Sequence, residues 1–139
     1  MANALYGLGR NKFARGEILW KATAGDTIKA ILVDTALYTV SIDTHEFLTS
    51  VGATARVAIS GAMTLIDPAL GVCDANDVTL PTVSGATVEA IVLYKDTGVE
   101  GTSPLIAYWD TGVTGLPFTP SGGDVIIQWQ NTDPKIFKL

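Results

Sequence analysis

The chain has 139 residues, a net charge of −5 and 17% charged residues, with one cysteine and one histidine. An acidic chain lacks the clustered Lys and Arg that phosphate binding requires, which argues against nucleic acid as the main partner. One cysteine excludes an intrachain disulfide, and the longest apolar runs, 90–94 and 105–109, are too short to cross a bilayer. We therefore expect a single domain over residues 1–139 with no membrane partner. The N-terminus lacks a secretory signal pattern, so we expect synthesis in the cytoplasm.

The N-terminal segment 1–16 is predicted to be a short helical arm. Its apolar residues recur loosely on one helix face, two glycines weaken the helix, and Gly16 would end it. Arg10, Lys12 and Arg15 give the first fifteen residues a charge of +3, so the remainder carries −5 − 3 = −8. Two interpretations stay open, a solvated segment and a docking arm. A docking arm could be deleted without loss of the fold.

From residue 17 onward the apolar period changes to two, which indicates strands. The segment 26–34 is apolar on both faces near its end, as in a central strand that is covered on both sides. Segments 86–96 and 105–110 predict an antiparallel hairpin with a wide connection. Further strands are expected at 17–22, 53–60 and 124–130, with 37–42 as an extension or a third strand.

Between these strands, one short helix is predicted near 44–51, with Asp43 or Thr44 as its N-cap. Many short strands, frequent Gly and Pro turns and little helix indicate an all-β fold, a β-sandwich or jelly roll.

The sequence offers no catalytic, cofactor-binding or metal-binding constellation. His45 and Cys73 are too few for a zinc site, and nothing near Cys73 in the sequence would lower its pKa, so we expect a small packed side chain. The run Asp74–Asp77 resembles the start of a calcium loop but lacks its later Gly and Glu. The other acids lie singly at predicted strand ends and turns, with no pairing that would suggest a glycosidase.

The three tryptophans could line a sugar-binding platform, but the core is the default place for each of them. The alternation places Trp20 with Ile18, and Trp129 with Val125 and Ile127, on inner faces. Trp109 follows Leu105 and Ala107 and is left open between core and surface.

In their order and spacing, ten short motifs resemble a family of small structural proteins of tailed bacteriophages. They cover most of the chain from about Leu5 onward: Val33–Thr35, Tyr38–Val40, His45–Leu48, Ala55–Ala58, Asp74–Thr79, Val88–Ala90, Tyr94–Gly98, Leu105–Tyr108, Gly115–Pro117 and Pro120–Asp124. Some members are cement proteins with a jelly-roll fold. The resemblance implies a virion protein on the outer capsid surface that binds the major capsid protein and itself, as a homodimer or homotrimer.

Three functional hypotheses follow. The first is a capsid decoration protein whose partner contacts include Arg10, Lys12, Arg15 and Trp109. The second is a phage tail or host-surface protein that binds a glycan through exposed aromatic side chains. The third is an enzyme, which the missing acid–base pair disfavours.

Overall fold

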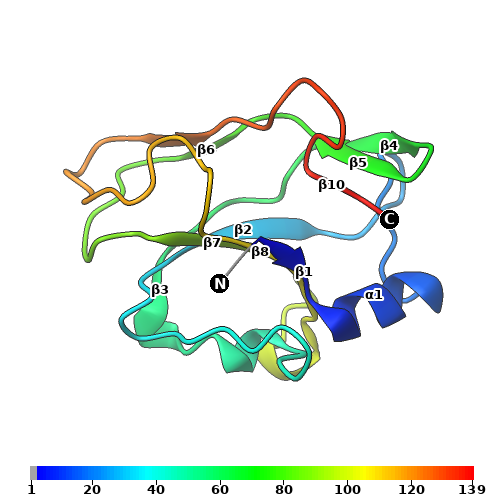
Figure 1. Cartoon of the computed structure of the whole chain (residues 1–139), viewed down its shortest axis with the longest axis horizontal. Coiled ribbons are helices and arrows are strands. Elements are labelled where there is room, and N and C mark those ends of the chain that lie inside the picture. Colours follow the sequence, from blue (N-terminus) through cyan, green and yellow to red (C-terminus); the bar gives the residue numbers. More distant parts are fainter. Residues whose placement is uncertain (1–2) are drawn as a thin grey trace.

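The computed structural model describes residues 3–139 as an all-β protein with one short α-helix. Its centre is a five-stranded antiparallel sheet, which lies in the middle of the molecule in Figure 1. The strand order is β1-β8-β7-β2-β3. The strands run over Ala4–Leu5 (β1), Ile28–Val33 (β2), Arg56–Ile59 (β3), Ala90–Lys95 (β7) and Leu105–Trp109 (β8).

The central strands are apolar on both faces because the sheet is covered on both sides. In β2, Ala30 and Leu32 point into one core, whereas Ile31 and Val33 point into the other. The neighbouring strand β7 alternates in the same way and pairs with β2 over the whole length of both. Each fully buried aliphatic side chain stabilises the fold by roughly 1.5–3 kcal/mol. The predictions for segment 26–34 and for the hairpin of β7 and β8 are confirmed.

A second layer covers one face of this sheet with two smaller antiparallel sheets, ordered β10-β5-β4 and β6-β9 (Figure 1). Its strands are Leu65–Ala69 (β4), Val72–Ala75 (β5), Val78–Leu80 (β6), Val125–Ile127 (β9) and Phe137–Lys138 (β10). Buried residues of both layers form one shared core, as in a sandwich. The jelly-roll topology stays a prediction.

The chain leaves the second layer between β9 and β10. Ile127 pairs with Val78, and Phe137 pairs with Cys73. Between these two pairs, the segment from β5 to β6 covers 78 − 73 = 5 residues, whereas the segment from β9 to β10 covers 137 − 127 = 10. Five surplus residues leave the ladder, and residues 128–136 form an excursion at the surface.

Helices and irregular segments cover the opposite face of the central sheet. Helix α1 (Gly7–Ala14) follows β1, and short 3₁₀ helices lie at Leu48–Ser50, Ala53–Ala55 and Glu100–Thr102 (Figure 1). Tyr6, between β1 and α1, is completely buried in this second core. An arm that could be deleted without loss of the fold was therefore a wrong interpretation, although Met1 and Ala2 lie outside the described residues.

Three local predictions differ from the structure. The predicted strand 17–22 is an irregular segment, and the amide of Leu19 donates to the Asp26 side chain instead of to a strand. Segment 37–42 is likewise irregular. The helix near 44–51 is reduced to the 3₁₀ turn at Leu48–Ser50, because residues 46–48 are extended and pair with residues 103–105.

Candidate binding surfaces

The four residues predicted to contact a partner lie in different environments. Arg10 and Arg15 on or next to α1 are exposed, and Arg15 forms an ion pair with Glu17. Lys12 is buried, and its ammonium group lies 3.0 Å from the Glu46 carboxylate. Its Nζ also lies 5.0 Å from the centre of the Phe47 ring. Lys12 therefore ties α1 to the segment before Leu48, and of the three cations only the two arginines are presented to solvent.

An apolar side chain stands at the tip of the hairpin between β4 and β5. Leu70 is 93% exposed, and both Leu70 and Gly71 have positive φ, 52° and 78°. Ala69 pairs with Val72 across the two-residue turn. Turns with positive φ at both central residues favour Asn, Asp or Gly, so a leucine here carries a local backbone cost.

The backbone of Leu139 lies beside this turn. The amide of Leu139 donates to the Gly71 carbonyl oxygen over 2.9 Å, and the Leu139 side chain is 55% exposed. On β4, Ile66 is also exposed on the side away from the core. Leu70, Leu139 and Ile66 are hereafter called the hairpin tip. Leu70 was not singled out from the sequence, in which the available signal is a leucine directly before a glycine, Gly71.

A groove of about 960 Å³ lies between the 110–119 loop and the 128–136 excursion. Trp109 at the end of β8 and Trp129 in the excursion meet in it, with ring centres 5.9 Å apart and planes inclined by 53°. Both indoles are partly exposed. The prediction of Trp129 as a core residue holds only in part, because its side chain is half-buried against the core and β9 ends before it, at Ile127. Trp20, by contrast, is buried against Phe137 as predicted.

Two hydrogen bonds fix the Trp129 ring in the groove. Its backbone amide donates to the Asp77 carboxylate over 3.0 Å, and its Nε1 donates to the Asn76 carbonyl oxygen over 3.2 Å. Asp74 accepts from the Ala75 amide and lies 3.5 Å from the Lys135 ammonium group. The acidic run that resembles a calcium loop is thus used to hold the excursion. Within residues 3–139, no group of three or more His, Cys, Asp or Glu side chains is arranged to hold a metal ion.

The groups with chemical reactivity are engaged in structural contacts. Cys73 is buried, and burial raises the pKa of its thiol to about 11. Cys73 belongs to the core on one face of the central sheet, whereas His45 contacts Tyr38 of the other core. The Nδ1 atom of His45 is 2.9 Å from the Tyr38 hydroxyl and accepts from the Ser41 amide. Burial lowers the pKa of His45. A nucleophile with an adjacent base is therefore not formed by this pair.

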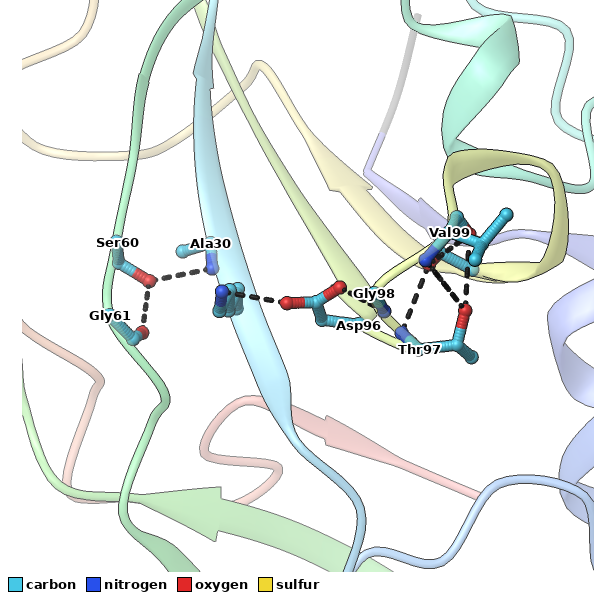
Figure 2. Close-up of polar contacts among 9 residues, drawn as sticks. Ala30, Ser60, Gly61, Asp96, Thr97, Gly98 and Val99 are labelled. Atoms are coloured by element: carbon cyan, nitrogen blue, oxygen red, sulfur yellow. Dashed lines mark hydrogen bonds and ion pairs between the residues drawn. The ribbon is translucent and has the colours of Figure 1, made fainter.

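Polar residues near the β7–β8 connection are also occupied structurally. Figure 2 shows Ser60 accepting from the Ala30 amide and donating to the Gly61 carbonyl oxygen. The same view shows Asp96 accepting from the Gly98 amide. Asp96 also pairs with Lys29 at 2.7 Å, and the hydrogen bond with Lys29 lowers the pKa of the Asp96 carboxyl group. These contacts brace the ends of the central strands.

No protein-family model matches the chain, and a search of curated proteins finds no match. The resemblance drawn from the motifs therefore enters the argument below as a hypothesis. No helix within the described part of the chain is long and apolar enough to span a bilayer.

Proposed function

We propose that the protein is a non-enzymatic decoration (cement) protein of a bacteriophage head, which binds the major capsid protein on the outer surface of the shell. The observation that carries the proposal is Leu70, a large apolar side chain held 93% exposed at a turn position that disfavours it. A left-handed conformation costs a non-glycine residue roughly 1–2 kcal/mol. Burying a leucine against a partner yields roughly 1.5–3 kcal/mol, so docking would more than offset this cost.

The composition of the surface agrees with a protein that binds by shape and apolar contact. Only 17% of the residues are charged, and besides the hairpin tip the exposed large apolar residues include Leu37, Ile59 and Val99. A homodimer or homotrimer would multiply the effective affinity of each weak contact, because binding of a second subunit becomes intramolecular. We assign the hairpin tip to the capsid contact. Arg10, Arg15 and Trp109 stay secondary candidates.

Co-sedimentation tests the proposal. Purified protein is mixed with expanded phage heads that lack it, and the pelleted amount is measured against concentration. We expect saturation at a whole-number ratio to the major capsid protein. Leu70→Asn should weaken the binding by about tenfold, the loss expected when one leucine contact is removed. Leu37→Asn is the matched control, because Leu37 is an exposed leucine outside the hairpin tip.

Three results would count against the proposal or against its assignment to the hairpin tip. Absence of saturable binding by folded protein would remove the decoration role and favour a tail or host-surface role. Equal binding of wild type and Leu70→Asn would remove the hairpin tip from the contact. An effect of Leu37→Asn as large as that of Leu70→Asn would show that the loss reflects surface polarity in general.

A further inference from the structure

We propose that the groove beside Trp109 and Trp129 is a binding site for a neutral oligosaccharide. This inference rests on the groove and not on the hairpin tip, which is formed by different strands; the two proposals share only Trp109, a secondary candidate for the capsid contact. The groove volume of about 960 Å³ lies at the upper end of the range for small-molecule sites. Aromatic rings on an apolar floor, with a few polar groups at the rim, are the general composition of such sites.

The charges in the groove argue against an anionic ligand. Its charged lining residues are Asp77, Asp124 and Lys135. Lys135 is paired with Asp74, whereas Asp77 accepts from the Trp129 amide and Asp124 accepts from the Thr82 amide. The net charge of the lining is therefore negative, and its single ammonium group already has a partner. Phosphate, sulfate or uronate groups would meet repulsion here.

The polar side chains left for a ligand are three amides and the hydroxyl group of Thr114. Gln128, Gln130 and Asn131 line the groove and are exposed, and their side chains make no hydrogen bond to another described residue. Each amide side chain offers two N–H donors and one carbonyl acceptor. A sugar hydroxyl both donates and accepts, so neighbouring hydroxyls can be bound by one amide without any buried charge.

The indole rings of Trp109 and Trp129 supply the apolar contacts with the ligand. Trp129 is fixed by its two hydrogen bonds, and Trp109 belongs to the central sheet, so neither ring must be ordered when a ligand binds. Ile126, exposed on β9, adds an aliphatic side chain to the groove lining. A pyranose with only equatorial substituents presents C–H groups on both faces, which suit an aromatic surface. This selects β-1,4-linked glucose or N-acetylglucosamine over sugars with axial hydroxyls.

Isothermal titration with chitopentaose and cellopentaose tests this site, with a heparin pentasaccharide as the anionic counter-probe. We expect saturable binding of at least one neutral pentasaccharide and none of heparin. The tryptophan emission should change on binding, because Trp109 and Trp129 are partly exposed while Trp20 is buried. The double variant Gln128→Ala and Gln130→Ala should bind about tenfold more weakly, as expected when two hydrogen bonds are lost.

Asn11→Ala is the matched control, an exposed amide on α1 that lies outside the groove. The proposal is overturned if neither neutral pentasaccharide binds folded wild-type protein, or if the double variant binds as tightly as wild type. It is also overturned if heparin binds best. Loss of head binding by the double variant, without any saccharide binding, would make the groove a protein interface instead.

Discussion

The phenolic oxygens of Tyr6 and Tyr38 lie 2.8 Å apart inside the protein, and this contact ties the N-terminal segment to the loop that follows β2. The Tyr38 oxygen also lies 2.9 Å from Nδ1 of His45. The Ser41 amide can only donate to Nδ1, so this nitrogen carries no proton and the ring is neutral. The three side chains form one chain of hydrogen bonds, buried at Tyr6 and partly buried at His45, that requires an unprotonated His45.

This arrangement predicts a loss of stability in mild acid. Burial lowers the pKa of His45 below its ordinary 6.5, so the unfolded chain binds a proton at a higher pH than the folded one. The stability from neutral His45 is therefore complete above about pH 6.5 and declines as the pH falls from there toward the lowered pKa. Urea denaturation at pH 7.5 and pH 5.5 measures the difference.

His45→Asn provides the control for the pH effect, because an asparagine oxygen can accept near the position of Nδ1 and does not titrate. We expect this variant to show a smaller loss of stability than wild type between the two pH values. Equal losses would assign the acid sensitivity to groups other than His45. The carboxyl group of Asp96 is not one of them, because its pKa is lowered from 3.8 and its contribution to stability is lost only further into acid.

Gly9 is predicted to be essential for the seating of α1 on the central sheet. A Cβ at this position would overlap the carbonyl oxygen of Leu105 in β8, which is backbone and does not yield. We expect Gly9→Ala to lower the free energy of unfolding by about 1–3 kcal/mol, the usual cost of overpacking. Gly52→Ala is the control, since its Cβ would meet no atom within 4 Å. Equal denaturation midpoints for the two variants would contradict this packing.

Leu70→Asn is expected to stabilise the isolated protein while weakening its binding to heads. Asn-Gly is the preferred pair where both turn residues have positive φ, and asparagine tolerates this conformation better than leucine. A gain of roughly 1 kcal/mol should appear as a higher denaturation midpoint. A lower midpoint would mean that the Leu70 side chain contributes to folding despite its exposure.

Cys73 is expected to be unreactive in the folded protein. Its thiol is 1% exposed and its pKa is raised to about 11, so only about one molecule in a thousand carries the thiolate at pH 8. Ellman's reagent should therefore react slowly in buffer and completely in denaturant, with one equivalent per chain. Rapid reaction in buffer would show that the second layer opens readily.

The sequence predicted the central strands best, because their signal does not depend on other parts of the chain. Segments such as 26–34 are apolar on both faces and rich in β-branched residues, which fits only a covered central strand. The failure at 17–22 has a physical cause: Ile18 and Trp20 alternate as in a strand, but they pack onto the core from an irregular segment. Alternation of apolar and polar residues thus indicates that one side of a segment is buried. It does not indicate that the segment pairs with another strand.

The candidate surfaces could be predicted less well, because both depend on where a strand stops. Trp129 was placed in the core on the assumption that its strand continues, whereas the ladder ends at Ile127. The exposure of Leu70 follows from a tight turn, and a leucine in a sequence does not reveal the sign of its φ. Strand ends are decided by pairing with distant residues, which periodicity does not report.

The excursion between β9 and β10 has an evolutionary consequence. The ladders on its two sides close independently, Ile127 on Val78 and Phe137 on Cys73, so the length of residues 128–136 is not fixed by strand register. Insertions, deletions and substitutions at this place would change the groove while leaving both sheets intact. The molecule thus joins two sheets fixed by strand pairing to a segment whose length the pairing does not fix, and a library randomised over residues 128–131 would be a scaffold for selecting new ligands.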